Sequence, residues 1–104
     1  MVRGDEVLLG PGKADLLEAL CRTGSLREAA SALGMSYMRA WELVKTMNRG
    51  FSAPLVVLER GGAGGGGARL SDTGERVLAL YRRMEEESLS AIGPAWRSLR
   101  RLLR

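Results

Sequence analysis

The chain has 104 residues, 45% of them hydrophobic, and carries 16 basic against 12 acidic side chains, for a net charge of +4. That length predicts one domain with a modest core, and the absence of an apolar run of about 18 residues argues against a membrane span. The sequence has no histidine and one cysteine, which removes the usual general base, the commonest metal ligand and any internal disulfide. We therefore expect neither an enzyme nor a bound cofactor. No secretory signal pattern precedes the first apolar run, so we expect the protein in the cytoplasm.

The positive charge is unevenly placed along the chain. Residues 36–70 carry five bases against two acids, and residues 94–104 carry four arginines and no acid, whereas residues 1–35 and 71–93 are net negative. Polyanion binding needs this kind of localisation. A solvated basic surface explains the charge equally well, so charge alone leaves both interpretations open.

The first third of the chain predicts a short strand and a helix. Residues 6–9 form a short apolar run, and the Gly-Pro-Gly cluster at residues 10–12 ends it. The amphipathic helix expected over residues 13–22 has an apolar stripe made of Leu16, Leu17, Leu20 and Cys21. Because Cys21 lies on that stripe, we expect its thiol to be buried and unreactive.

Residues 24–51 organise the rest of the chain and predict two helices joined by a tight turn. Ser25 is placed to cap the first helix, and Glu28 to complete a capping box. Gly34 supplies a positive φ at the corner, and Ser36 caps the second helix. The inner faces are expected to hold Leu26, Ala29, Ala30, Leu33, Met35, Tyr37, Ala40, Trp41, Val44, Met47 and Phe51. This pattern is typical of a helix-turn-helix, whose second helix enters the major groove of DNA; an ordinary αα-hairpin is the alternative.

Two short strands are expected after the second helix, at residues 55–60 and 68–70, on either side of the glycine-rich segment 61–67. A phosphate-binding P-loop would need a lysine and a serine or threonine directly after the glycines. Ala68-Arg69-Leu70 stands there instead, which disfavours a nucleotide site. Two strands joined by a glycine-rich tip form the wing of a winged-helix domain.

Ser71 is placed to cap a further helix, whose apolar stripe is Val77, Leu78, Tyr81, Met84, Leu89 and Ile92. Gly93-Pro94 interrupts this stripe and is expected to start a last short helix among four arginines. Such a helix is too short to be stable alone. It could pack on the chain's own core, on a partner chain, or reach DNA or a membrane, and contact with a second copy of the chain is the first expectation. The predicted fold class is mainly α with a small β wing: a winged helix-turn-helix over residues 1–92, with a C-terminal dimerisation helix in the basic tail 93–104.

Several motifs resemble the amino-terminal domain of the molybdate-responsive regulator ModE, namely residues 36–41, the Met47-Asn48 pair, residues 55–60, the glycine run with Ala68 and Leu70, and Thr73-Gly74. The similarity extends from about Lys13 to Tyr81, and more broadly the chain is similar to the LysR-type winged helix. The resemblance implies a dimeric transcription factor that binds palindromic duplex DNA. In ModE proteins a separate carboxy-terminal domain binds molybdate, and these 104 residues do not include one. Met38 stands where a basic residue is expected in the relatives, which implies that a different DNA sequence is recognised.

The candidate DNA contacts follow from placing the second helix in a major groove. Ser36 and Arg39 are expected to face the bases, where Arg39 can pair bidentately with guanine. Met38 is expected to touch a thymine methyl group, and Glu42 to contact cytosine or orient the arginine. The expected phosphate contacts are Ser25, Tyr37, Lys45, Arg60 and Arg69. Trp41 is assigned to the core because of its helical spacing from its apolar neighbours.

The sequence is compatible with two other functions. A winged helix can serve as a protein-interaction module, with the basic, apolar tail docking on a partner. A regulator that senses an oxyanion, molybdate or tungstate, at the glycine-rich loop is the second alternative. DNA binding would fall steeply with added salt, whereas a sensor would be protected from heat by its anion.

Overall fold

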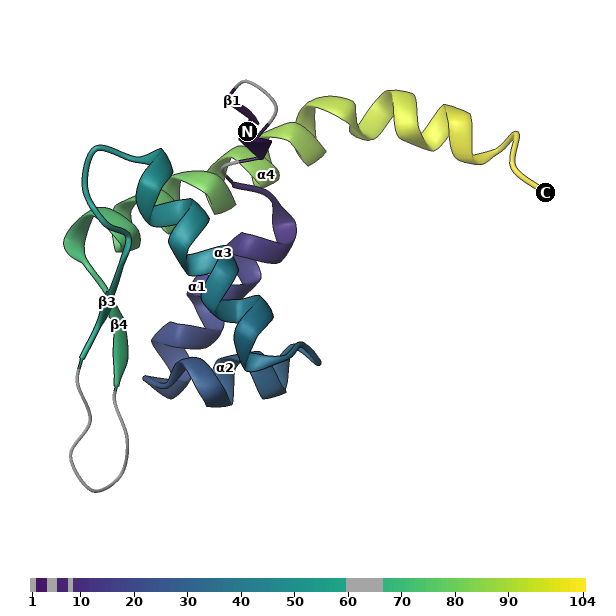
Figure 1. Cartoon of the computed structure of the whole chain (residues 1–104). Helices are drawn as coiled ribbons and strands as arrows, with labels where there is room; N and C mark the ends of the chain where they lie inside the picture. Colours follow the sequence, from purple (N-terminus) through teal and green to yellow (C-terminus); the bar gives the residue numbers. More distant parts are fainter. Residues whose placement is uncertain (1, 4–5, 8, 60–66) are drawn as a thin grey trace.

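The computed structural model describes residues 2–3, 6–7, 9–59 and 67–104. The elements, in chain order, are β1 (Val2–Arg3), β2 (Glu6–Val7), α1 (Pro11–Thr23), α2 (Leu26–Ala32), α3 (Tyr37–Gly50), β3 (Val56–Leu58), β4 (Ala68–Leu70) and α4 (Asp72–Arg100). Figure 1 shows α1, α2 and α3 grouped together, with the β3–β4 hairpin beside them and α4 running across the group and beyond it. This is the mainly α, winged helix-turn-helix architecture that the sequence predicts.

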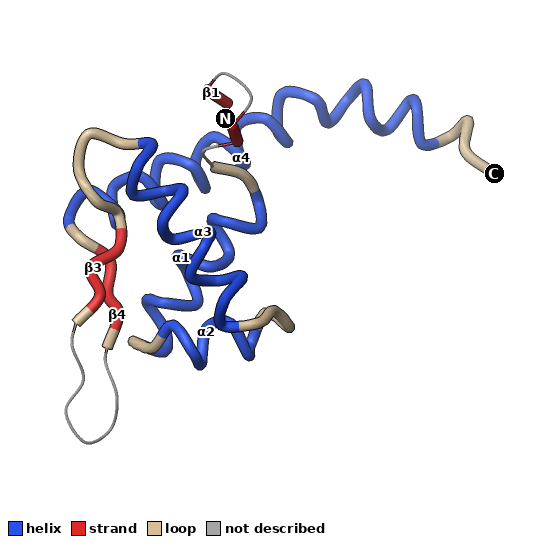
Figure 2. The backbone as a smooth tube through the Cα atoms, in the orientation of Figure 1, coloured by secondary structure: helices blue, strands red, loops and turns tan. Residues whose placement is uncertain are grey.

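Two antiparallel strand pairs are present in the described part of the chain, β1 with β2 and β3 with β4 (Figure 2). The second pair is the predicted wing. The backbone N–H of Glu59 donates to the Gly67 carbonyl at 2.8 Å, and that of Ala68 donates to the Gly24 carbonyl at 2.9 Å. The wing is therefore hydrogen-bonded both within itself and to the turn that follows α1. Arg60 and the predicted hairpin tip lie outside the described residues.

The hydrophobic core lies between the first three helices and the wing. Its largest fully buried side chains are Leu9, Leu16, Leu17, Leu20, Val44, Met47 and Leu55. The small residues Ala29, Ala30 and Ala40 are also buried, as predicted, and let α2 and α3 cross closely. Half-buried side chains packed against this core include Leu33, Met35, Trp41 and Phe51. Fully burying a large aliphatic side chain contributes about 1.5–3 kcal/mol. The buried core residues therefore supply most of the stability of the unit formed by α1, α2, α3 and the wing, which we call the body.

The three predicted serine caps are all formed. The hydroxyl oxygens of Ser25, Ser36 and Ser71 accept hydrogen bonds from the backbone N–H three residues further on, at 3.1, 3.0 and 3.0 Å. Each such cap stabilises its helix by about 1 kcal/mol. The complete capping box predicted for α2 is wrong, however, because the N–H of Ser25 donates to the hydroxyl oxygen of Thr23 at 3.3 Å. The corner after α2 is as predicted, with Gly34 at a φ of 68°.

Cys21 is exposed, so the predicted burial of its thiol is wrong. The buried side of α1 is centred on Leu16 and Leu20, and the next residue is turned by about 100° around the helix. Partial desolvation raises the pKa of the Cys21 thiol, and the carboxylates of Glu75 and Glu18 raise it further. The exposed thiol therefore has less thiolate character than an ordinary cysteine at neutral pH.

The predicted helix break at residues 93–94 is also wrong, because α4 continues through Pro94 to Arg100. Proline removes a backbone hydrogen bond from a helix, but Pro94 is exposed, so water can bind the carbonyl that loses its partner. The division of the chain after residue 92 stays a prediction. Although α4 is 29 residues long, no helix in the described part of the chain has the length and apolarity needed to cross a membrane.

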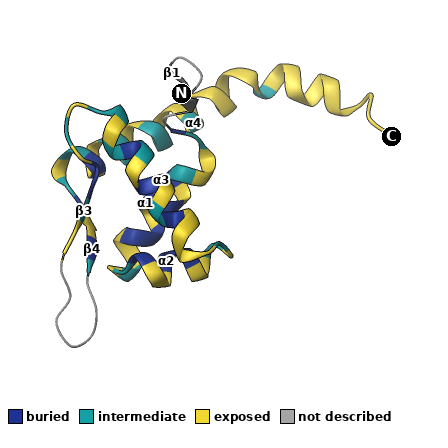
Figure 3. Ribbon diagram, viewed as in Figure 1, coloured by how far each residue is buried: buried dark blue, intermediate teal, exposed yellow. Residues whose placement is uncertain are grey.

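The projecting half of α4 makes the molecule elongated. Figure 3 shows this half almost entirely exposed, and Gly74 is the one buried residue of the helix. The radius of gyration of the Cα atoms is 16.3 Å and the principal extents are 56 × 30 × 24 Å. A compact chain of this length would have a radius of gyration of about 13 Å. The second half of α4 therefore extends away from the core and has little intramolecular packing of its own.

Candidate nucleic-acid interface

Helix α3 presents one face to the core and the opposite face to solvent. Ala40, Val44 and Met47 are buried on the inner face. The outward stripe, which we call the outer face of α3, consists of Met38, Glu42, Lys45 and Arg49. These residues recur at helical spacing and therefore share one side of the helix. Met38 is 66% exposed, although it is a large apolar side chain. An exposed apolar side chain such as Met38 among charged groups suits a surface that contacts both thymine methyl groups and polar base edges.

The first turn of α3 adds polar groups to the edge of this face. The hydroxyl oxygen of Ser36 accepts the N–H of Arg39 at 3.0 Å, and its own proton stays available for donation. Tyr37 is 40% exposed, so its predicted place on the inner face is wrong, whereas its exposure fits the predicted contact role. Arg39 is exposed, and no described carboxylate forms an ion pair with it. Its guanidinium is thus available to a ligand.

Lys45 is held loosely on the outer face. Its ammonium group lies 3.9 Å from a carboxylate oxygen of Glu42 and 4.7 Å from the ring centroid of Trp41. Trp41 is half-buried against the core, as predicted. Exposed ion pairs of this kind contribute about 0–1 kcal/mol, so Lys45 can exchange its partner for a phosphate at little cost.

Two predicted phosphate contacts lie outside α3. Ser25 is half-buried and caps α2 through its oxygen, which leaves the hydroxyl proton free to donate. Arg69 is exposed on the wing, and its Nε donates to Glu59 at 2.8 Å. A phosphate contact by Arg69 would therefore have to replace the Glu59 carboxylate.

Arg27 belongs to this surface although nothing local in the sequence singles it out. Its guanidinium carbon lies 5.2 Å above the ring centroid of Tyr37, so the first turns of α2 and α3 are linked across the turn. The two residues are ten apart in the sequence, and only the crossing of the two helices brings them together.

Asn48 fixes the wing relative to α3. Its side-chain oxygen accepts the N–H groups of Leu55 and Val56 at 2.8 and 3.1 Å, and its amide nitrogen donates to the Val56 carbonyl at 3.0 Å. One amide thus satisfies three backbone groups at the start of β3. The sequence resemblance includes Asn48, but the periodicity of α3 gives no sign of this role.

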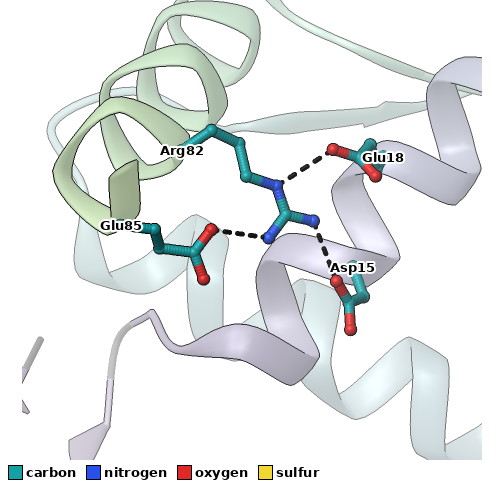
Figure 4. A network of polar contacts seen from close by, with 4 residues as sticks. All are labelled: Asp15, Glu18, Arg82 and Glu85. Carbon is teal, nitrogen blue, oxygen red and sulfur yellow. Dashed lines mark hydrogen bonds and ion pairs between the residues drawn. The ribbon is translucent and has the colours of Figure 1, made fainter. Parts of the chain in front are cut away.

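The first half of α4 is held against the body by an ion-pair network and by a close backbone approach. The Arg82 guanidinium donates to Asp15, Glu18 and Glu85 at 2.8, 2.9 and 2.9 Å (Figure 4). These carboxylates raise the pKa of an already basic group, so Arg82 is always charged. At the start of the helix, a side chain on Gly74 would collide with the carbonyl of Leu55. Neither feature was predicted from the sequence.

A capped, outward-facing second helix beside a β wing defines the winged helix-turn-helix class of protein. Residues 13–75 match the model of the bacterial regulatory helix-turn-helix protein, lysR family, and the chain belongs to this family. Among solved structures, the chain is similar to the CbnR_DBD-DNA complex, with a TM-score of 0.65 and 21% identity over 88% of this chain and 98% of that one. At that identity the likeness shows the fold alone. A full-length LysG from Corynebacterium glutamicum matches at 25% identity and a TM-score of 0.60 over 88% of this chain and 29% of that one.

The similarity to ModE proteins is confirmed. Over 77 residues, the chain is 47% identical to the molybdenum transport protein ModE of Azotobacter vinelandii and 43% identical to the molybdenum-pterin-binding protein MopB of Rhodobacter capsulatus, covering 74% of this chain and 28% of each relative. It is 38% identical over 71 residues to the DNA-binding transcriptional dual regulator ModE of Escherichia coli, covering 68% of this chain and 27% of that protein. The chain thus spans less than a third of the length of these curated relatives.

Proposed function

We propose that this chain is the duplex DNA-binding unit of a transcriptional regulator, with α3 lying in a major groove and the wing against the adjacent backbone. The observation that carries the proposal is the outer face of α3, which is exposed, polar and charged directly opposite a fully buried apolar face. Membership of the lysR family and 38% identity to a DNA-binding dual regulator support it. The cytoplasmic location expected from the sequence belongs to the same proposal.

The first turn of α3 is proposed to read the bases. Arg39 would donate two hydrogen bonds to guanine, and Ser36 would donate its hydroxyl proton to a neighbouring base edge. Met38 would contact a thymine methyl group. Glu42 would accept from cytosine, or stay with Lys45, to which it is already close.

Phosphate contacts are proposed at the edges of the same surface. Lys45 and Arg69 would exchange weak carboxylate partners for phosphate oxygens, and Ser25 and Tyr37 would donate their hydroxyl protons. Arg60, which lies outside the described residues, keeps its proposed role from its place in the wing sequence. These contacts would position the protein without reading sequence.

The proposed active species is a homodimer that pairs through the projecting half of α4. Four exposed apolar residues recur there at spacings of three, four and three, and we call them the α4 seam: Leu89, Ile92, Trp96 and Leu99. That spacing is the repeat by which two helices pack together. The seam begins beside the acidic run 85–87 and ends among four arginines, so an antiparallel pair would bring opposite charges together. A two-fold dimer matches a palindromic DNA site.

Selection of bound sequences from a pool of random duplexes tests this proposal. We expect enrichment of a palindrome with half-sites about one helical turn apart, and binding that weakens steeply as salt is raised. Failure to enrich any sequence, together with salt-insensitive capture of a protein partner, would favour a protein-interaction module instead. An oxyanion-sensing regulator would in addition show a rise in melting temperature with molybdate or tungstate and none with sulfate.

A further inference from the structure

The arginines near the helix-turn-helix differ in how they are neutralised. Arg69 is paired with Glu59 at 2.8 Å and Arg82 with three carboxylates. No described carboxylate pairs with Arg27, which instead lies 5.2 Å above the ring of Tyr37. That distance is within the range of a cation–π interaction, which holds a guanidinium in place without cancelling its charge.

The position of Arg27 conflicts with local helix electrostatics. It is the second residue of α2, where the helix dipole disfavours a cation. Its neighbour Glu28 follows directly in sequence, and adjacent residues do not face one another on a helix. The contact between α2 and α3 is already made by buried Leu26, Ala29 and Ala40. Apart from the exposed contact with Tyr37, which contributes about 0.5–1 kcal/mol, the packing of α2 on α3 does not need an arginine at this position.

We propose that Arg27 and Tyr37 together form a phosphate clamp that binds one phosphodiester group of duplex DNA beside the recognition helix. A guanidinium over an aromatic ring keeps its N–H groups free of carboxylate partners, and its planar fork of donors matches two phosphate oxygens. The Tyr37 hydroxyl is a second donor, and no described residue forms a hydrogen bond with it. Figure 1 shows α2 and the first turn of α3 at the end of the body toward which the wing strands run, so the clamp lies on the side where the DNA is expected. The inference rests on the proposed function and adds to it a contact that fixes the depth and angle of α3.

Salt titration of binding tests the clamp. The variants are Arg27→Ala, Arg27→Lys and Tyr37→Leu, and the charge-matched control is Arg76→Ala, an exposed arginine on α4. Each is measured by fluorescence anisotropy on the selected duplex and on a scrambled duplex of equal length. We expect Arg27→Ala to weaken both duplexes by the same factor, about tenfold, and to reduce the slope of log K against log salt by about 0.9. Arg27→Lys should keep the slope but lose part of the affinity, and Arg76→Ala should match the unmodified protein.

Two further measurements separate the clamp from a structural role. The melting temperature of Arg27→Ala should stay close to that of the unmodified protein, because the loss of the exposed contact with Tyr37 is offset by removal of a cation from a helix start. The losses from Arg27→Ala and Tyr37→Leu should not add in the double variant, because the two residues act as a unit. In phosphate ethylation interference, Arg27→Ala should show one fewer phosphate per half-site whose ethylation blocks binding.

Failure of the clamp and failure of the proposed function have different signatures. If the unmodified protein binds duplex DNA but Arg27→Ala leaves its affinity and salt slope unchanged, the clamp is wrong and the proposed function stands. Affinity lost on the selected duplex alone would also overturn the clamp, because it would make Arg27 a base-reading residue. If the unmodified protein binds no duplex, both are wrong.

Discussion

The body of the molecule and the projecting half of α4 contain comparable apolar residues, but the body buries them and the projecting half of α4 exposes them. Every buried hydrophobic side chain in the described part of the chain lies between Leu9 and Leu70. In the second half of α4, by contrast, Leu89, Ile92, Trp96 and Leu99 are all about half-exposed or more. The body therefore buries most of its apolar side chains within the chain, whereas those of the α4 seam stay exposed.

An apolar stripe in a sequence can serve packing within one chain or assembly with a second chain, and the sequence pattern alone does not distinguish the two. The apolar stripe of α1 and the seam of α4 have the same periodicity, but the first packs on neighbouring helices and the second extends past the end of the core. The stability of the fold should depend on the body, and assembly should depend on the seam. The substitutions below test that division, from the largest expected effect on stability to the smallest.

Replacing Gly74 by alanine should destabilise the body most. The new Cβ would collide with the Leu55 carbonyl, a backbone atom that also accepts the N–H of Ser71 at 2.9 Å and so cannot move alone. We expect the free energy of unfolding to fall by about 3 kcal/mol, measured by chemical denaturation. Gly12→Ala is the matched control, since it also lies in the first turn of a helix but has no atom within 4 Å. It should be neutral or stabilising by up to about 1 kcal/mol; equal losses in both variants would contradict the packing argument.

Removing the Asn48 amide should cost about 2 kcal/mol of unfolding free energy. Asn48→Ala leaves the N–H groups of Leu55 and Val56 and the Val56 carbonyl without their partner, and Val56 is buried. Amide hydrogen exchange should speed up at the start of β3 while α1 stays protected. Ser52→Ala, at an exposed position, is the control and should change stability by less than about 0.5 kcal/mol. Unchanged exchange at β3 would show that Asn48 does not hold the wing.

These two residues also show where prediction from sequence stops. Periodicity and capping correctly placed α1, α2, α3 and the wing, because those signals are local. Gly74 and Asn48 act on backbone groups brought near by the fold, and the pairing of Arg27 with Tyr37 arises only from a helix crossing. The exposure of Cys21 was not predicted for a related reason. Periodicity shows which side of a helix is apolar, but how much of that side is buried depends on the elements that pack against it. Arg39 and Lys45 were predicted from residue type and helix position, and their proposed roles stay predictions.

Arg82 lies where the first half of α4 meets α1, and its replacement should lower the free energy of unfolding by less than the two substitutions above. Its side chain is 28% exposed and donates to carboxylates on both α1 and α4. We expect Arg82→Ala to lower the unfolding free energy by about 1 kcal/mol at low salt and by less at high salt, since the partners are half-exposed. Arg83→Ala removes a single exposed pair with Glu87 and should cost about 0.3 kcal/mol. If the two variants behave alike at all salt concentrations, the network does not anchor α4.

Substitution in the α4 seam should change stability least and assembly most. Ile92→Ser with Leu99→Ser removes two exposed side chains, so the unfolding free energy of the dilute protein should change by less than about 0.5 kcal/mol. The mass from sedimentation should shift from dimer to monomer at concentrations where the unmodified protein is a dimer. Leu80→Ser, an exposed leucine of α4 outside the seam, is the control and should remain dimeric. A monomeric unmodified protein, or a dimer insensitive to the seam, would contradict the proposed assembly.

The central claim is that the outer face and first turn of α3 read a DNA duplex, and comparison of Arg39→Ala with Lys45→Ala on a panel of single-base variants of the selected site tests it most directly. For Arg39→Ala we expect the discrimination at one guanine per half-site to fall by about 1–3 kcal/mol, with the preferences at other positions intact. For Lys45→Ala we expect equal weakening of every duplex and a smaller salt dependence. Equal losses on every sequence for both variants, with no base preference relaxed, would contradict the claim.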